Sequence, residues 1–391
     1  MKNNLFFALV FLFVLLFSQA GCNRDHPDGD LSWTLGPFVK ADTANPVLGP
    51  VDSSLFVCPV RNAPVKWEAK DVFNPAAVVR NGKIHLLYRA EDSIGKLKGT
   101  SRIGMAVSKD GFVFKRFPQP VLYPEKDRYL EYEWEGGCED PRIVEDENGM
   151  YHMTYTAWNG DKPRLFIATS KDLFHWTKYG SVFQRAYHGK YFRVASKSGA
   201  IVCRPENDRL VAAKIRGKYW MYFGDTDIFL AWSDDLIHWT PVEKSKEDIA
   251  KITRNPDGKA ELLPVLQPRK GKFDSRLVES GPPALITKQG ILLIYNSKNS
   301  AEFGDSTLPD GTYAAGQALF DKHDPGKLLH RTDTWFIKPD RPYEITGQVN
   351  NVCFVEGLAR FQGKWFLYYG TADSKIAVAV SSREQKIFSS L

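Results

Sequence analysis

Five short runs of apolar and aromatic residues recur along this chain, each directly after a glycine turn. With their glycines, the runs occupy 82–90, 149–157, 217–225, 290–298 and 363–371. Val, Ile, Tyr, Phe and Trp dominate them, and these residues favour half-buried positions in a pleated strand. No long segment with a helical period of about 3.6 residues competes with them. The pattern therefore predicts a chain built of strands.

The spacing of these runs identifies an internal repeat. Successive glycines are 67, 68, 73 and 73 residues apart: Gly82, Gly149, Gly217, Gly290 and Gly363. An apolar segment precedes each glycine, at 74–79, 140–144, 209–215, 281–286 and 355–359. Another segment follows the aromatic run at 105–114, 167–176 and 230–239, with looser copies around Ala318 and Ala379. Each unit is therefore expected to run strand, turn, aromatic strand, loop and strand.

Five such units predict an all-β fold, a five-bladed β-propeller in which four-stranded blades surround a central channel. A β-sandwich is the alternative for a strand-rich chain, but it does not explain the period. The propeller is expected to form one domain over residues 32–391, although length alone suggests two or three domains of about 150 residues.

Composition fits this interpretation and excludes one class of partner. The chain has 391 residues, of which 43% are hydrophobic and 25% charged, as in globular proteins that bury a large core. Its 52 basic and 46 acidic residues are mixed along the sequence and give a net charge of +6. Because there is no basic block, nucleic acid is not expected as a partner.

The first 21 residues have the pattern of an export signal. Lys2 precedes an apolar stretch at 5–17, which is shorter than the roughly 18 residues of a spanning helix, and small residues follow it. Cys22 stands directly after Ala-Gly, as in a bacterial lipobox, although Gln19 occupies the place where Leu is usual. We therefore predict a signal peptide over 1–21, lipidation of Cys22 and a polar tether over 22–31. The protein is then an exported lipoprotein of the outer membrane, held there only by its lipid, with ordinary secretion as the alternative.

The remaining cysteines are Cys58, Cys138, Cys203 and Cys353. Their spacing contains no CxxC or zinc pattern, so four separate buried thiols are expected, although an exported protein is also able to pair them.

Polar residues gather where the first strand of each unit begins. In a propeller this strand lines the channel, so residues at its start converge at one mouth. The candidates there are Asn74, Glu139, Asp140, Arg142, Glu279, Asn350, Asn351 and Glu356. The aromatic strands end near further candidates, namely Arg89, Glu91, Asp225, Asp227 and Asp373.

Several carboxylates with Asn, Arg and aromatic residues at one mouth suit a sugar ligand. Glycoside cleavage needs two carboxyl groups on opposite sides of the bond, one of them protonated because its neighbours raise its pKa. The alternatives are that these acids cap turns or that they bind calcium, although no EF-hand-like spacing is present. His175 and His238 recur within the repeat and are expected to be structural. No metal or cofactor is predicted.

Together these motifs resemble glycoside hydrolase family 130. The resemblance runs from about Gly36 to Val380 and rests on FNPAAVV (73–79), LLYRAED (86–92), IGMAVSKDG (103–111), GGCEDPRIV (136–144), SDDLIHW (233–239), GPP (281–283) and YYGTAD (368–373). It implies a five-bladed propeller that acts on β-mannosides with inversion. Many members of the family are phosphorylases that release mannose 1-phosphate, and others are hydrolases.

The resemblance also assigns roles. Asp140 matches the general acid, whose proton in the phosphorylases passes through a sugar hydroxyl. Asn74, Arg89 and Asp373 match residues that hold the mannose at the cleaved end. Arg142 matches the motif arginine, which contacts sugar or orients Asp140. Asp225 is a further sugar-binding candidate.

The sequence departs from the phosphorylase pattern at the phosphate site. Asn207 stands where an arginine is usual, and Phe223-Gly224 where a His-Arg pair is usual. Lys214 is retained, and Arg164 matches another phosphate arginine. Loss of charge-assisted donors weakens binding of a dianion by several kcal/mol.

Two glutamates, Glu279 and Glu356, stand where phosphorylases carry neutral residues, and an anion there repels phosphate but activates water. We therefore predict an inverting, exo-acting β-mannosidase that releases mannose, by resemblance from β-1,2-linked manno-oligosaccharides. Asp140 is the acid, and either Glu279 or Glu356 is the base, about 6.5–9.5 Å away. The alternatives are a β-mannoside phosphorylase, against which export argues, and a non-catalytic glycan-binding propeller.

Overall fold

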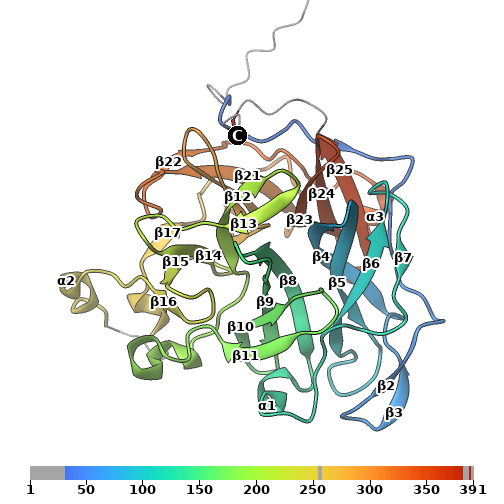
Figure 1. Cartoon of the computed structure of the whole chain (residues 1–391). Helices are drawn as coiled ribbons and strands as arrows, with labels where there is room; N and C mark the ends of the chain where they lie inside the picture. The colour runs from blue at the N-terminus through green and yellow to red at the C-terminus, as the bar shows by residue number, and fades with distance from the viewer. Residues whose placement is uncertain (1–30, 254–257, 382–386, 389–391) are drawn as a thin grey trace, which may run out of the picture.

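The computed structural model describes residues 31–253, 258–381 and 387–388, and its regular secondary structure is almost entirely β-strand (Figure 1). The all-β prediction is confirmed. The predicted signal peptide, Cys22 and the tether up to residue 30 lie outside the described residues. The described helices are short: α1 (Leu130–Glu133), η1 (Ala186–Arg193), α2 (Lys246–Ile249), η2 (Lys259–Glu261) and α3 (Pro342–Ile345). Within the described ranges no helix is long and apolar enough to cross a membrane.

Five antiparallel groups of strands follow one another along the chain, and we number them as units one to five. Unit one contains β4 (Asp71–Arg80), β5 (Lys83–Glu91), β6 (Ser101–Ser108) and β7 (Lys115–Arg116). Unit two contains β8 (Gly137–Glu145), β9 (Tyr151–Trp158), β10 (Pro163–Ser170) and β11 (Thr177–Ser181). Unit three contains β12 (Ala200–Glu206), β14 (Tyr219–Phe223), β15 (Ile228–Ser233) and β16 (Trp239–Pro241).

Units four and five complete the series. Unit four contains β18 (Leu277–Ser280) and β19 (Ala284–Ile286), then β20 (Ile291–Lys298), β21 (Tyr313–Phe320) and β22 (Leu328–Arg331). Unit five contains β23 (Cys353–Phe361), β24 (Lys364–Thr371), β25 (Lys375–Ser381) and β1 (Val39–Lys40). Outside this scheme lie the hairpin β2 (Leu55–Cys58) and β3 (Ala63–Lys66), and the strands β13 (Arg209–Ala212) and β17 (Pro264–Leu266). The five aromatic runs are the second strands β5, β9, β14, β20 and β24, as predicted.

Unit three corrects one prediction. Its first strand is β12, which pairs with β14 through Ala200 and Tyr222, and not the segment 209–215. That segment contains β13, which folds back on β12 as a hairpin and bridges to β8. An extra apolar hairpin therefore lies between the true first strand and the glycine turn, and its proximity to Gly217 made it resemble the first strand.

The first strands surround a common centre. β4 lies against β23 on one side and β8 on the other, and β12 runs parallel to β19. Asn296 of β20 closes the gap between units four and five, because its side chain donates to the carbonyl of Val355 and accepts from the Val355 N–H. β1 forms the outer strand of unit five, where Val39 pairs with Val380, so the beginning of the described chain completes its last sheet.

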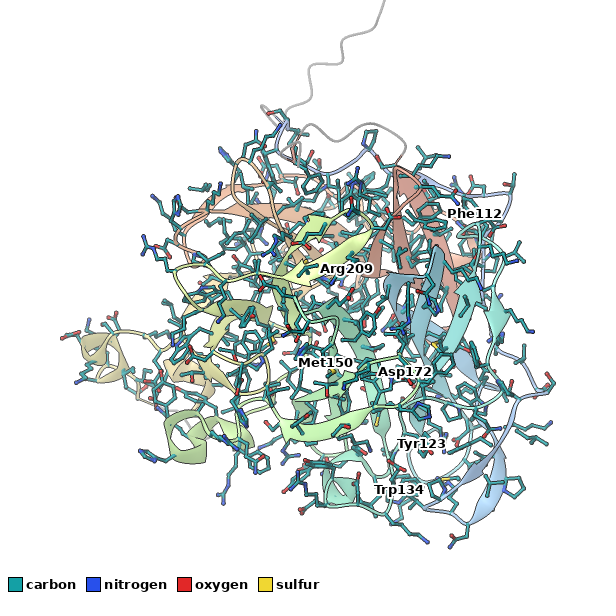
Figure 2. The ribbon with its side chains drawn as sticks, viewed as in Figure 1. Phe112, Tyr123, Trp134, Met150, Asp172 and Arg209 are labelled. Atoms are coloured by element: carbon teal, nitrogen blue, oxygen red, sulfur yellow. The ribbon has the colours of Figure 1, made fainter. Side chains whose placement is uncertain are left out.

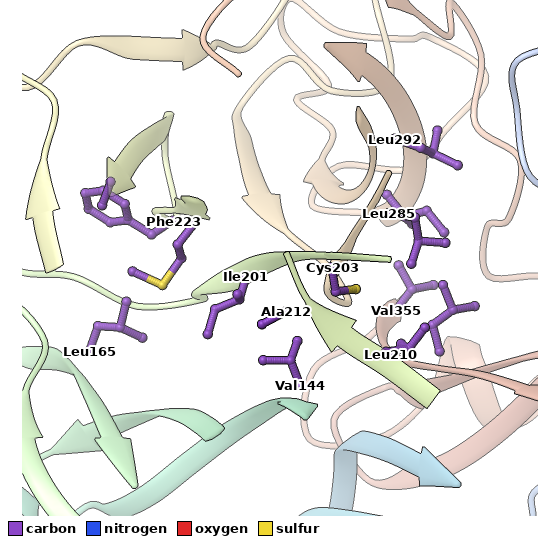
Figure 3. Packing of buried hydrophobic residues seen from close by; sticks show 14 of the residues in the cluster. Val144, Leu165, Ile201, Cys203, Leu210, Ala212, Phe223, Leu285, Leu292 and Val355 are labelled. Carbon is purple, nitrogen blue, oxygen red and sulfur yellow. The ribbon is translucent and has the colours of Figure 1, made fainter. Parts of the chain in front are cut away.

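Apolar side chains fill the spaces between neighbouring units. Figure 3 shows part of one cluster, to which units two to five contribute Val144, Leu165, Ile201, Leu285 and Val355. A fully buried aliphatic side chain of this kind stabilises the fold by about 1.5–3 kcal/mol. Cys58, Cys138, Cys203 and Cys353 are buried free thiols, which confirms the prediction of separate cysteines.

The repeat also reuses one turn. After β6, β10 and β15, the carboxylates of Asp110, Asp172 and Asp235 accept backbone N–H bonds from two and three residues ahead. Figure 2 labels Asp172 in the turn after β10. His175 and His238 each pair with the aspartate of their own turn at 2.7 Å, as expected for structural histidines.

Candidate active site

Three first strands are bulged at the position of a candidate residue. The strand register shifts between Phe73 and Pro75, between Glu139 and Arg142, and between Val355 and Gly357, so Asn74, Asp140 and Glu356 lie at the irregularities. Asn74 and Asp140 have positive φ values of 45° and 49°, which Asn and Asp tolerate better than most residues. A bulge re-aims a side chain out of the regular alternation, and such strained positions gather at functional sites.

Asp140 is held by side chains from unit one. Asn74 donates from Nδ2 to Asp140 Oδ1 at 3.0 Å, and Arg89 Nη1 approaches the same oxygen at 3.4 Å. All three residues come from the predicted site, so the structure brings the candidate acid and two of its predicted neighbours together. Asn74 Oδ1 is buried and makes no hydrogen bond within the described part of the chain, which leaves an acceptor beside the carboxylate.

Arg89 also binds two further carboxylates. Its Nη2 lies 2.6 Å from Glu91 Oε1 and 2.8 Å from Glu139 Oε1. Ser101 Oγ lies 3.2 and 3.3 Å from these two glutamate oxygens, so its one O–H is shared between them. One guanidinium therefore faces three acids, Glu91, Glu139 and Asp140, and its charge reduces their mutual repulsion.

Glu279, at the end of β18, is 3% exposed and meets the segment that leads into β12. Ser198 Oγ donates a short hydrogen bond to Glu279 Oε1, and Lys197 Nζ lies 3.4 Å from the same oxygen. The carboxylate charge of Glu279 is the largest influence that raises the pKa of Lys197, so this lysine is a cation at neutral pH.

Glu356 has a different environment. It is 0% exposed, and neither carboxyl oxygen has a hydrogen-bond partner among the described residues. Arg142 Nη1 is its nearest charge, at 3.5 Å from Oε1. Burial raises the pKa of Glu356 well above its usual range, because the charge of Arg142 does not outweigh the loss of water.

Arg142 links unit two to units four and five. Its Nε and Nη2 donate to the backbone carbonyls of Gly281 and Ser280, both at 2.8 Å, and Nη1 donates to the carbonyl of Asp140 at 3.2 Å. The residue is 2% exposed, so its guanidinium is occupied by protein groups.

Asp225 and Asp373 lie at the ends of second strands and are half-buried. Asp225 faces Lys259 at 3.5 Å. Burial, with Asp140 and Glu91 nearby, raises the pKa of Asp373 to about 7. Tyr313 of β21 supplies a half-buried aromatic ring whose pKa is raised first by burial and then by the charge of Glu279.

The protonation pattern differs from the one expected for Asp140. Burial tends to raise its pKa, but the charges of Arg89 and Lys197 and the Asn74 hydrogen bond outweigh this and lower it. Its neighbour Glu139 shows the opposite shift, since burial raises the pKa of that carboxyl to about 7. The two acids share Arg89 and titrate as a pair, which holds one proton up to about neutral pH.

Three positions compared with the phosphate site of the phosphorylases have no contact with Asp140, Glu279 or Glu356 among those described. Lys214 is exposed, with its ammonium 5.0 Å from the ring of Tyr219, and Asn207 forms the turn between β12 and β13. Arg164 packs its guanidinium over Tyr132 and Phe192. The described residues contain no group of three His, Cys, Asp or Glu side chains arranged to hold a metal ion.

Sequence reasoning missed Lys197 and Ser198. The segment KSGAIV (197–202) has the form of the other strand starts, in which a polar residue stands before Gly or Pro and then before small and apolar residues. Ser198 also shares the positive φ of Asn74 and Asp140, at 59°. That common form was the signal that could have identified the unit-three contribution to the site.

Comparison with known proteins gives consistent matches. The model of glycoside hydrolase family 130, described as beta-1,4-mannooligosaccharide phosphorylase, matches residues 40–389. A 1,2-beta-oligomannan phosphorylase from Thermoanaerobacter sp. (strain X514) is 34% identical over 324 residues, 81% of this chain and 91% of that protein.

Two solved structures are more similar in sequence than that relative. A glycosyl hydrolase from Bacteroides ovatus has a TM-score of 0.84 at 46% identity, covering 91% of this chain and 96% of the other. The second has a TM-score of 0.83 at 47% identity, covering 89% and 94% of the two chains. It is described in the words "The GH130 family of mannoside phosphorylases contains glycoside hydrolases that target beta-1,2 mannosidic linkages in Candida mannan".

Proposed function

We propose a function from the premise that this chain belongs to glycoside hydrolase family 130, as the match over residues 40–389 shows. It is thus a glycoside-acting enzyme, and we infer that it is an inverting, exo-acting β-mannosidase. Its substrates in this proposal are β-1,2-linked manno-oligosaccharides and its product is mannose. We further propose that units one to five are the blades of a five-bladed propeller, with the site at one mouth of its channel.

The ion pair between Lys197 and Glu279 is the observation that supports hydrolysis over phosphorolysis in this proposal. A phosphate nucleophile is a dianion and needs cations that are free to bind it. Here the buried carboxylate of Glu279 lies 3.4 Å from Lys197, and Asp140, Asp225 and Glu139 also act on this lysine. The surrounding negative charge repels phosphate but not water, so water is the nucleophile that this site favours.

The base is Glu279 in this proposal. An inverting base must be ionised at working pH and reach a water molecule. Lys197 and Ser198 favour the ionised form of Glu279 and limit the rise in pKa that burial causes. Glu356 lacks such partners, and its raised pKa keeps it protonated, so we assign it a supporting role beside Arg142.

Asp140 is the proposed acid, with Asn74, Arg89, Asp225 and Asp373 binding the sugar. The proton retained by the Glu139 and Asp140 pair supplies the acid form near neutral pH. Arg142 positions this pair through the Asp140 carbonyl instead of contacting sugar.

The products from β-1,2-mannobiose, incubated with and without phosphate, test the proposal. Free mannose at a rate indifferent to phosphate is expected. Mannose 1-phosphate that forms only with phosphate would favour the phosphorylase, the activity for which the 34%-identical Thermoanaerobacter relative is named. Binding without any turnover would favour a glycan-binding protein. Asp140→Asn should abolish turnover and leave the melting temperature unchanged.

We also propose that residues 1–21 direct export and that Cys22 carries lipid at the outer membrane. The order of charged, apolar and small residues before Cys22 supports this. Radiolabelled palmitate should enter the protein in cells and fail to enter Cys22→Ser.

A further inference from the structure

A hollow of about 560 Å³ lies beside the outer strand of unit two, apart from the residues of the candidate active site. Five aromatic residues line it, of which Tyr129 and Phe166 are buried. The other three come from different elements and are partly exposed: Tyr132 of α1, Tyr179 of β11 and Phe192 of η1. The polar side chains that line it are Arg128, Ser181, Gln184, Arg185 and His238. The lining contains no acidic residue.

Two of the three partly exposed rings are held in place by their neighbours. The Tyr132 and Phe192 rings meet edge to face at 5.3 Å, and the guanidinium of Arg164 lies 5.1 and 5.7 Å from their centres. Tyr179 is 40% exposed, the largest exposure among the three rings that the hollow offers to a ligand. Rigid rings bind a ligand at little cost in conformational entropy.

The polar residues have unused hydrogen-bonding capacity. Gln184 and Arg185 are exposed, and their side chains make no hydrogen bond or ion pair with the rest of the described chain. Arg128 is fixed by stacking over Tyr129 and by a 2.6 Å hydrogen bond to its hydroxyl. A fixed donor and two free polar side chains beside apolar rings match a pyranose unit, which presents C–H groups on its faces and hydroxyls around its edge.

We propose that this hollow is a second, non-catalytic sugar-binding site that holds internal mannose units of a longer β-mannoside chain. The inference rests on the proposed function, because it assigns the same class of substrate to both sites. A chain bound here keeps its ends at high local concentration near the active site, so binding in the hollow increases the turnover of long substrates only. A disaccharide gains nothing from it.

Tyr179→Ala tests the proposal, and Phe174→Ala is its matched control. Phe174 is a 37% exposed aromatic residue in the larger hollow beside unit one. Binding of long-chain β-mannan is measured by affinity electrophoresis, and turnover by kcat/KM on mannan and on β-1,2-mannobiose. Tyr179→Ala should weaken mannan binding roughly five- to tenfold and lower kcat/KM on mannan, with turnover of mannobiose unchanged. Phe174→Ala should match the unmodified protein in every assay.

Unchanged mannan binding in Tyr179→Ala would overturn the second site, and so would an equal loss on mannobiose and on mannan at an unchanged melting temperature. Binding that collapses in high salt would instead indicate an anionic ligand and would also overturn it. If the unmodified protein fails to turn over mannobiose, the proposed function fails by itself, and the electrophoresis still reports on the hollow.

Discussion

Replacing Glu279 and Glu356 separately by Gln distinguishes the two candidate bases. Each substitution keeps the size of the side chain and removes its ability to ionise. Lys197 lies 3.4 Å from Glu279 and favours its charged form, whereas burial raises the pKa of Glu356 well above its usual range and favours its neutral form. If Glu279 is the base, as we propose, the first variant loses the charge that activates water and the second leaves that charge in place.

The expected magnitudes follow from these environments. Removing a positioned general base lowers the rate about 10²- to 10⁴-fold, equivalent to about 3–5 kcal/mol of transition-state free energy. Glu279→Gln leaves Lys197 without its nearest anion, but that side chain is 24% exposed and keeps three other acids nearby. The free energy of unfolding should fall by only about 1–2 kcal/mol. Glu356→Gln should lower the rate less than tenfold, with a stability change of about 1 kcal/mol from the buried amide.

Both variants are compared with the unmodified enzyme by kcat/KM on β-1,2-mannobiose and by urea unfolding. Azide gives a chemical readout, because a small anion attacks the sugar without a base and should restore turnover to Glu279→Gln as a mannosyl azide of inverted configuration. Equal losses in the two variants at equal stability, or azide rescue of Glu356→Gln only, would refute the assignment of the base.

Three further predictions concern the rest of the site. The pKa of Asp373 is raised to about 7 in the folded protein, so the folded state binds its proton more tightly, and the free energy of unfolding should fall as pH rises from about 4 to 7. Asp373→Asn should flatten this pH dependence in urea unfolding. An unchanged pH dependence would contradict the assigned burial. Arg142→Lys should lower the free energy of unfolding by about 2–5 kcal/mol, because the carbonyls of Ser280 and Gly281 lose their donors. A loss below about 1 kcal/mol in the same measurement would show that these hydrogen bonds are dispensable. Gly370→Ala should reduce kcat more than stability, because its Cβ collides with Asn74 Oδ1 and displaces a partner of Asp140. The control is Gly49→Ala, whose Cβ makes ordinary contact with Lys375 and which should retain full activity. Equal activity in the two variants would exclude this role for Asn74.

The strands were predictable because local pattern determines them. An aromatic run after a glycine occurs in all five units and forms the second strand in each. The first strand of unit three was not predictable in the same way, since an extra hairpin with similar apolar composition separates β12 from Gly217. Two runs of equal hydrophobicity cannot be ranked by periodicity, and only the pairing of Ala200 with Tyr222 distinguishes them.

The site was predictable in its acids and less so in its cations and proton positions. Asn74, Arg89 and Asp140 were identified because they stand in distinctive motifs, and the structure joins them within 3.4 Å. Lys197 stands in an ordinary polar segment, and its importance arises only when unit three comes to lie against unit four. The low pKa of Asp140 likewise depends on which cations approach it, which is a property of tertiary packing.

The pairing of β1 with β25 has a consequence for the order in which the molecule assembles. Val39 is made early and Val380 late, so their contact has one of the largest sequence separations in the described fold. Such contacts form slowly because almost the whole chain must be ordered before they can close. Until then, one edge of β25 exposes unpaired N–H and C=O groups, a template on which another chain can add. The vulnerable species in synthesis and refolding is thus a nearly complete fold in which β25 is an open edge, and loss of residues 39–48, which lie along β25, would make that species permanent.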